Sequence, residues 1–379
     1  MTKLHSLFLV SFLAGASAIA QTAPPAETPA GASLNDTARF LAGLPVTGPL
    51  EPLTHDPIWQ EHASAINEAW LRKGRTQITP IRQWMQTNAP EFHRSTDTAY
   101  YMFGGPDFLY ASIFFPNANT YILAGLEPVG SVPNIMSLPA DAFANDLIAL
   151  RSSMNTILRF QYFITKDMRT DLGRGDIGGT LPILYVFLAR LGYTIDEVTY
   201  VTSPAPGVKI VFSGSEQPQT LYYFKTDLSG GNSAFLRWCA ARGPGLSLLK
   251  AASFLMHGDG FSGVRNFLLQ NSRVIIQDDS GIPLRDFPKG WSVACYGRYV
   301  PHKEEFAKYY QPDLAALYAQ NPPPAPIDFA FGYHWQKSDG MLMLATHGPQ
   351  RALPVQEQPQ KAPVRKRSTV ALSNDDQTQ

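Results

Sequence analysis

The sequence predicts a mixed α/β (or α+β) fold, a single globular domain in which helices flank a mixed β-sheet. Two observations predict it. Segments with apolar residues at helical spacing are interspersed with short β-branched and aromatic segments along the chain. The middle of the chain also holds three strand candidates in succession, at 198–202, 208–212 and 220–225, which are separated by turn residues. This second pattern is typical of an antiparallel meander.

The two ends of the chain differ in composition from its centre. Residues 1–20 resemble a cleavable signal peptide, with an apolar run at Leu7–Ala18 and a small-x-small cleavage site that ends at Ala20. The run is shorter than the roughly 20 residues that a membrane span needs. We predict a Pro/Ala-rich linker at 21–32, the globular domain at 33–346 and a disordered tail at 347–379. We therefore expect a periplasmic or secreted protein.

The charge balance excludes some classes of partner. The chain has 31 basic and 31 acidic residues, for a formal net charge of +0. Neither nucleic acid nor an anionic membrane would attract such a chain electrostatically. We expect no nucleic-acid partner and no membrane span in the mature protein. The partner would be a small molecule or a component of the cell envelope, and the sequence identifies no cofactor and no metal.

The first half of the chain predicts a parallel strand pair. Two strand candidates, 98–103 and 120–124, flank a short helix at 108–115. The crossover between them is long enough for parallel pairing. Further helices are predicted at 35–44, 57–74, 80–86, 139–158 and 180–191.

The second half predicts helices before its last strands. Helices are expected at 233–242, 246–256, 262–270 and 304–320. Strands are expected at 273–277 and 291–298, and the segments 328–335 and 341–346 are predicted to form a closing hairpin.

Acidic residues follow three of the predicted strands. Asp107 follows 98–103, Glu127 follows 120–124, and Asp278 and Asp279 follow 273–277. In parallel sheets, ligands bind outside the carboxyl ends of the strands. If these strands are parallel, the carboxylates converge, and at least one of them should have a raised pKa unless a cation neutralises it. Such a cluster would suit a divalent cation or acid/base catalysis. The alternative is a set of separate helix caps and turn residues.

A glycine-rich loop at Met256–Gly263 gives a further catalytic candidate, His257, which lies close in sequence to Ser262. The loop does not match the G-x-S-x-G pattern of a nucleophilic serine, because position 264 is valine. The alternative is that these residues cap two helices. The segment Gly173–Gly178 matches G-x-G-x-x-G, but no strand candidate precedes it, as dinucleotide binding would require.

Cys239 and Cys295 are the only cysteines, and in an exported protein they would form one disulfide. The alternative is two buried free thiols.

The sequence leaves the function open between classes. One hypothesis is an enzyme, a hydrolase with a carboxylate-lined site formed by Asp107, Glu127, Asp278, Asp279 and His257. The alternative is a non-catalytic protein that binds a small molecule, glycan or peptide through its aromatic residues, which make up 12% of the chain. A third hypothesis is an envelope-interaction protein.

Overall fold

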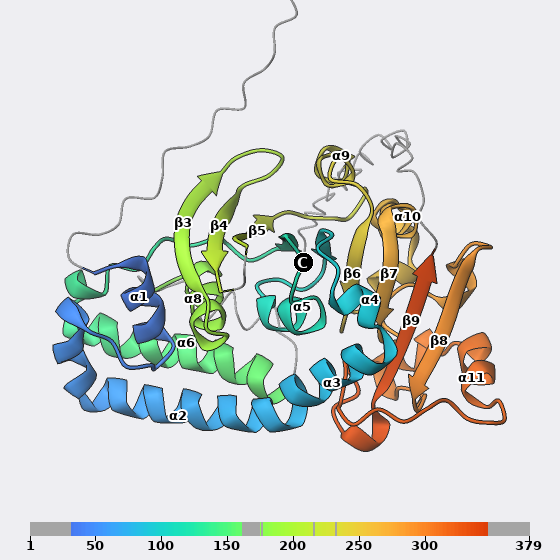
Figure 1. Ribbon diagram of the computed structural model, residues 1–379, viewed down its shortest axis with the longest axis horizontal. Coiled ribbons are helices and arrows are strands. Elements are labelled where there is room, and N and C mark those ends of the chain that lie inside the picture. Colours follow the sequence, from blue (N-terminus) through green and yellow to red (C-terminus); the bar gives the residue numbers. More distant parts are fainter. Residues whose placement is uncertain (1–31, 161–174, 176, 215–216, 232, 348–379) are drawn as a thin grey trace, which may run out of the picture.

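A nine-stranded mixed β-sheet forms the centre of the protein in the computed structural model (Figure 1). The structure describes residues 32–160, 175, 177–214, 217–231 and 233–347. The strands are β1 (Ala99–Tyr101), β2 (Thr120–Gly125), β3 (Thr194–Val201), β4 (Gly207–Ser213), β5 (Gln219–Lys225), β6 (Gly245–Leu249), β7 (Ser272–Gln277), β8 (Trp291–Gly297) and β9 (Met341–His347). Their order in the sheet is β3-β4-β5-β2-β1-β6-β7-β9-β8. The predicted mixed α/β fold class is confirmed.

The five central strands, β5, β2, β1, β6 and β7, all run in the same direction. The predicted parallel pair is β1 and β2, with Ala99 opposite Tyr121. The predicted meander is also present, because β3, β4 and β5 pair in antiparallel fashion. On the other side, β9 is antiparallel to both β7 and β8. The loops that follow the five parallel strands therefore emerge on one side, which we call the carboxyl edge.

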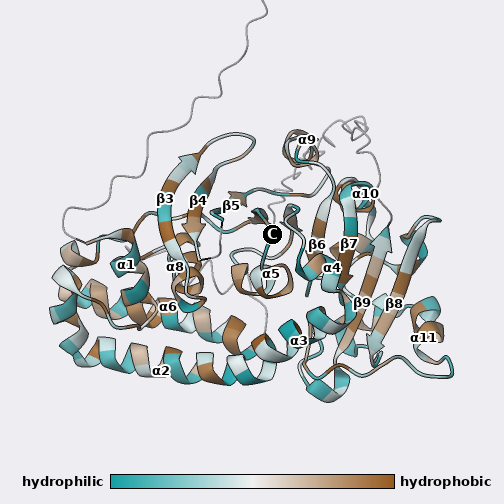
Figure 2. Ribbon diagram, in the orientation of Figure 1, coloured by the Kyte–Doolittle hydropathy of each residue, from teal (hydrophilic) through white to brown (hydrophobic). Residues whose placement is uncertain are grey.

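Helices cover the two faces of the sheet unequally. They are α1 (Leu34–Leu41), α2 (Pro57–Lys73), α3 (Thr79–Asn88), α4 (Pro90–His93), α5 (Phe108–Phe114), α6 (Ala140–Phe160), α8 (Leu181–Arg190), α9 (Ser233–Ala240), α10 (Ser262–Asn271) and α11 (Pro312–Tyr318). One face packs against helices from the N-terminal half of the chain, including α5, α6 and α8, whereas α9 and α10 cover the other. Figure 2 shows α2 with mixed hydrophilic and hydrophobic residues, as expected for an outer helix.

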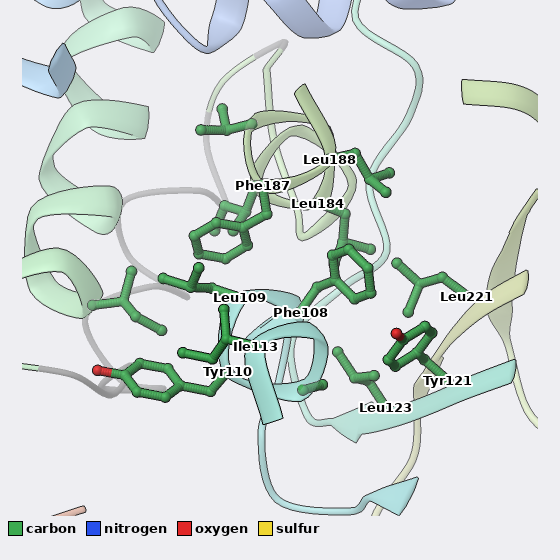
Figure 3. Packing of buried hydrophobic residues seen from close by; sticks show 14 of the residues in the cluster. Phe108, Leu109, Tyr110, Ile113, Tyr121, Leu123, Leu184, Phe187, Leu188 and Leu221 are labelled. Atoms are coloured by element: carbon green, nitrogen blue, oxygen red, sulfur yellow. The ribbon is translucent and has the colours of Figure 1, made fainter. Parts of the chain in front are cut away.

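Successive side chains of β2 point alternately to the two faces of the sheet. Tyr121 and Leu123 lie in the core formed with α5 and α8, while Ile122 and Ala124 face the core formed with α9 and α10. Figure 3 shows the first core, where Phe108 packs edge-on against Tyr121 with ring centroids 5.0 Å apart. A central strand that is buried on both faces has a continuous apolar sequence. This placement holds the β1 and β2 loops firmly at the carboxyl edge.

The predicted helix at 246–256 is wrong. Its first part is strand β6, which is buried throughout between β1 and β7. An apolar run of this length fits a buried parallel strand as well as a helix, so periodicity alone could not decide between them. The strand ends in a loop where Ala251, Ser253 and Phe254 have φ angles of 50°, 55° and 55°. A short 3-10 turn, Leu255–His257, follows.

The predicted closing hairpin is also wrong. β9 pairs with β7 and β8 instead of with 328–335, which forms only the isolated bridge between Phe331 and His334. The predicted helix 304–320 is divided into a 3-10 helix at Glu304–Tyr309 and α11, because Pro312 begins a new helix.

The predicted disulfide is absent, because Cys239 and Cys295 are both free. Cys239 lies in α9, and its carbonyl accepts a hydrogen bond from Tyr100 of β1. Cys295 lies in β8, which is four positions from β1 in the sheet. At a strand spacing of about 4.8 Å, β1 and β8 are roughly 19 Å apart. A disulfide requires Cα atoms within about 7 Å of each other, so the two cysteines cannot be bridged.

Four of the sequence predictions concern residues that lie wholly or partly outside the described part of the chain. They are the signal peptide at 1–20, nearly all of the 21–32 linker and of the 347–379 tail, and half of the Gly173–Gly178 motif. Among the helices that the structure describes, none combines the length and the hydropathy needed to cross a membrane.

Candidate functional site

The carboxyl edge carries all four acidic residues that the sequence singled out. Asp107, Glu127, Asp278 and Asp279 follow β1, β2 and β7, and each is at most 3% exposed. They share an edge because these three strands run parallel. Each carboxylate has its own hydrogen-bonding partners, however, so the edge contains several distinct arrangements.

Asp107 is the N-cap of α5 and half of a buried ion pair. Its Oδ1 accepts a hydrogen bond from the amide of Tyr110 at 3.1 Å, and its Oδ2 accepts one from the hydroxyl of Tyr101 at 3.0 Å. Lys250 Nζ also lies 3.0 Å from Oδ2. Burial lowers the pKa of Lys250, although the nearby Asp107 opposes this shift. These contacts give Asp107 a structural role, which agrees with the alternative interpretation that it caps a helix.

Lys250 was missed by the sequence analysis. It directly follows β6, and it lies at the carboxyl edge only because residues 245–249 form a strand. Its place in a predicted helix concealed it.

The Asp278 carboxylate accepts hydrogen bonds from residues of three loops. Its Oδ1 accepts a hydrogen bond from Ser280 Oγ at 2.5 Å, and its Oδ2 accepts from the amides of Ala251 at 3.3 Å and Tyr333 at 3.0 Å. Burial and the adjacent Asp279 raise the pKa of Asp278. A raised pKa on at least one carboxylate of this edge is what the sequence analysis expected.

Asp279 lies between two histidines. The Nε2 atom of His302 is 3.2 Å from Asp279 Oδ1, and the Nε2 atom of His334 is 3.1 Å from it. Burial alone would raise the pKa of Asp279, but the hydrogen bonds from both histidines outweigh it and lower the pKa to about 2. Burial likewise disfavours protonated His302, yet the bond to Asp279 raises the pKa of this histidine.

Sequence reasoning did not connect these three residues. His302 lies in the segment after β8, and His334 lies in the bridge before β9, at 23 and 55 residues from Asp279. No short motif spans such separations. Only the order β7-β9-β8 brings the segments together.

His257 lies beside this cluster. Its Nε2 atom is 3.3 Å from the backbone oxygen of Asp279, and its ring packs against Phe254 and Tyr309. Burial lowers the pKa of His257, which favours the neutral form of its imidazole. Ser262, the possible nucleophile near it in sequence, instead donates its hydroxyl to the backbone oxygen of Asp259 at 2.8 Å.

A cavity of about 140 Å³ opens above the ends of β1, β2, β5 and β6. Its lining combines apolar and aromatic side chains with two carboxylates, Glu127 and Asp227. The described residues that line it are Met102, Phe103, Gly105, Ala124, Gly125, Leu126, Glu127, Thr226, Asp227, Leu228, Ala251, Ala252, Ser253, Leu255 and Phe261.

Two glycines make room for the Glu127 side chain at this cavity. A Cβ atom at Gly125 would lie 2.3 Å from Glu127 Oε2, and one at Gly105 would lie 3.4 Å from it. Gly105 also has a φ of +54°, which disfavours larger residues. The Tyr223 hydroxyl donates to the Glu127 backbone oxygen at 2.9 Å and lies 3.3 Å from Oε2. Glu127 is therefore held in place at the cavity wall.

Comparison with known proteins finds no matching family model, no similar curated protein and no similar solved structure. The function is therefore inferred from the geometry of the carboxyl edge.

Proposed function

We propose that this protein binds a nucleoside-type ligand, uncharged or positively charged, in the cavity at Glu127. The observation that carries this proposal is the position of the cavity. From β1, the chain adds β2 and β5 on one side of the sheet and then β6 and β7 on the other. In open α/β sheets, ligands bind at the carboxyl ends of the strands where the strand order reverses in this way.

The position of Glu127 supports a ligand with neighbouring hydroxyl groups. Glu127 follows the second parallel strand and comes 22 residues after Gly105, which lies in the loop between β1 and α5. In nucleotide-binding α/β proteins, an acidic residue about 20 residues beyond the glycine loop hydrogen-bonds the ribose hydroxyls. Because a similar strand order does not by itself imply a similar ligand, the charge and the size of the cavity decide the ligand class.

The charge of the cavity argues against a phosphorylated ligand. The described lining residues include two carboxylates and neither Lys nor Arg. A phosphate often binds at the N-terminus of a helix, but at α5 the Asp107 carboxylate already accepts the Tyr110 amide. A dinucleotide would therefore meet electrostatic repulsion. An uncharged nucleoside, or one that carries a positive charge, would not.

The size and the apolar walls suit a ring system. Phe103 and Phe261 lie edge-on with ring centroids 5.7 Å apart, and Leu228 and Leu255 add apolar surface. The volume of about 140 Å³ is below the roughly 300–1,000 Å³ typical of pockets for whole drug-sized ligands. The cavity would hold the sugar of the ligand, while the rest extends through its open side.

Calorimetric titration tests this proposal with adenosine, guanosine, cytidine and uridine, each beside its 2′,3′-dideoxy analogue. At least one nucleoside should bind, and its dideoxy analogue should bind about 10-fold or more weakly, since a hydrogen bond to a charged acceptor contributes roughly 1.5–3 kcal/mol. Glu127→Gln should show a similar loss.

Glu68→Gln is the matched control, because the Glu68 side chain is 82% exposed on α2. It should bind the nucleoside as the native protein does. Absence of binding at millimolar concentrations, or equal affinity of Glu127→Gln, would overturn the proposal. Equal binding of free monosaccharides would show a glycan site instead.

A hydrolase activity at the same edge is our second candidate. The observation that favours it is the position of His257, half-buried beside Asp279, where its imidazole could act as a general base; burial lowers its pKa and so favours the neutral form that a base requires. A panel of generic esters and phosphoesters tests it. Turnover that His257→Ala reduces by about 100-fold or more would support it, whereas turnover that is unchanged in this variant would exclude His257 as the base.

A further inference from the structure

We infer that Asp279, His302 and His334 form a binding site for a divalent transition-metal ion, with Zn²⁺ as the best match. One ligand atom from each residue lies within 4.8 Å of the other two. Two imidazoles and one carboxylate form a donor set typical of zinc and of the later first-row metals. Mg²⁺ and Ca²⁺ prefer oxygen ligands, so two imidazoles argue against them. This inference is independent of the nucleoside proposal.

The present spacing of the donor atoms is close to what a metal would require. Bonds of about 2.0–2.2 Å in tetrahedral geometry place neighbouring ligand atoms roughly 3.3–3.6 Å apart. The two Nε2 atoms lie 3.2 and 3.1 Å from Asp279 Oδ1. All three donor atoms lie within 4.8 Å of one another, so the side chains already converge on a common point. Three protein ligands would leave a fourth position for water or a substrate atom, as in catalytic zinc sites.

The site is enclosed but retains one approach. The side chains of Asp279 and His334 are 1% and 3% exposed, and that of His302 is 16% exposed. Burying a carboxylate with two imidazoles is costly unless the charges are paired or coordinate a metal. The partial exposure of His302 gives an ion a path from solvent.

Surrounding contacts hold the three donors in position. Gln311 Nε2 donates to the Asp279 backbone oxygen at 3.0 Å. The ring of His302 packs edge-on against Phe254, with centroids 5.4 Å apart. Asp278 accepts the amide of Tyr333, the residue next to His334. Contacts around the first ligands orient them and tune metal affinity.

The loop after β6 connects this site to the ligand cavity. Ala251, Ala252 and Ser253 line the cavity. The amide of Ala251 also donates to Asp278, and the hydroxyl of Ser253 is 2.9 Å from that of Tyr333. An ion at Asp279 would thus lie across one short loop from the cavity. When bound there, it would supply a Lewis acid and a coordinated water at this edge.

Metal binding to the purified full chain tests the inference without any activity assay. The protein is first stripped with a chelator. Titration with ZnCl₂ should then give one ion per chain, and Co²⁺ in its place should give the visible absorption of a low-symmetry nitrogen–oxygen site. His302→Ala and His334→Gln should each weaken Zn²⁺ binding by on the order of 100-fold or more. Zn²⁺ should raise the Tm of the native protein and have little effect on that of His302→Ala.

His55→Ala is the control, because the His55 side chain is 73% exposed and pairs with Glu51 in the 3-10 helix before α2. It should bind Zn²⁺ like the native protein. Glu127→Gln should do the same, which separates failure of this inference from failure of the nucleoside proposal. Absence of stoichiometric binding, or native affinity in both histidine variants, would show that the cluster is a hydrogen-bonded network alone.

Discussion

One buried carboxylate, Asp107, lies near two buried amines. Lys250 pairs with it directly, and its Nζ lies 3.8 Å from the centroid of the Tyr110 ring. Lys73, at the end of α2, is 3% exposed, and its Nζ lies 5.9 Å from the same ring. Burial, and then the positive charge of Lys250, lower the pKa of Lys73 to about 7, although Asp107 opposes this. Lys73 therefore loses its proton near neutral pH.

Lys73→Met should weaken the pH dependence of stability. The pKa of Lys73 is about 7 in the folded protein and about 10.4 in the unfolded chain. Between these values, the unfolded chain binds more protons, so the native protein gains stability as pH rises, by up to about 1.4 kcal/mol per pH unit. Below pH 7, both states are protonated and this gain is absent. Urea unfolding at pH 7, 8 and 9 should show a smaller rise in the variant.

The exposed Lys289 provides the control for this prediction. Lys289→Met should leave the dependence on pH as it is in the native protein. If Lys73→Met and the native protein gave parallel curves over this range, the lowered pKa of Lys73 would be wrong.

At the scale of single elements, the loop that follows β6 contributes most to the geometry of the carboxyl edge. Ala251, Ser253 and Phe254 adopt left-handed φ angles, which cost L-residues roughly 1–2 kcal/mol each. Other elements hold them there. Ser280, after β7, accepts the amide of Ala252 at 2.7 Å, and Tyr309 stacks on Phe254 with centroids 4.4 Å apart. Strain of this kind concentrates at ligand sites. The strained loop lies between the cavity at Glu127 and the metal-ligand candidates Asp279, His302 and His334, which agrees with a functional role for this loop.

The acidic residues after β1 and β7 show how local and long-range roles combine. The alternative interpretation of Asp107 as a helix cap agrees with its contacts, and Asp278 also accepts the amide of Ser280 within its own turn. Both carboxylates in addition bind partners that are distant in sequence, Lys250 and Tyr333 respectively. Turn chemistry predicted the first kind of contact and could not predict the second.

At the scale of the whole molecule, the arrangement of faces and edges decides the state of the cysteines. Cys239 is buried on the inner side of α9, to which it belongs, and Cys295 lies in the edge strand β8. We expect alkylation in denaturant without reductant to label two thiols. In the folded protein, Cys239 should resist labelling, because burial strongly raises its pKa and closes off access. Cys295, whose pKa burial raises to about 11, should react slowly.

Mass spectrometry after each labelling gives the count. Rapid labelling of Cys239 in the folded protein would contradict its burial. A mass that shows fewer than two labelled thiols after complete unfolding would contradict the free state of both cysteines.

The sequence by itself determined the fold class, most elements and the positions of acidic residues after three strands. Helical periodicity located α2, and the strand–helix–strand pattern predicted the parallel pair of β1 and β2. Because the parallel direction places successive strand ends together, Asp107, Glu127 and Asp278, with Asp279 close by, could be assigned to one edge before their partners were known.

Only the tertiary structure decided which residues meet there. A short apolar run such as 245–249 is compatible with helix or strand, and its neighbours β1 and β7 decide for strand, which brings Lys250 to Asp107. The insertion of β9 between β7 and β8 brings His302 and His334 to Asp279. Local patterns record each residue's preference within a few positions along the chain. Pairing between distant strands depends on burial of the whole sheet, which no local pattern encodes.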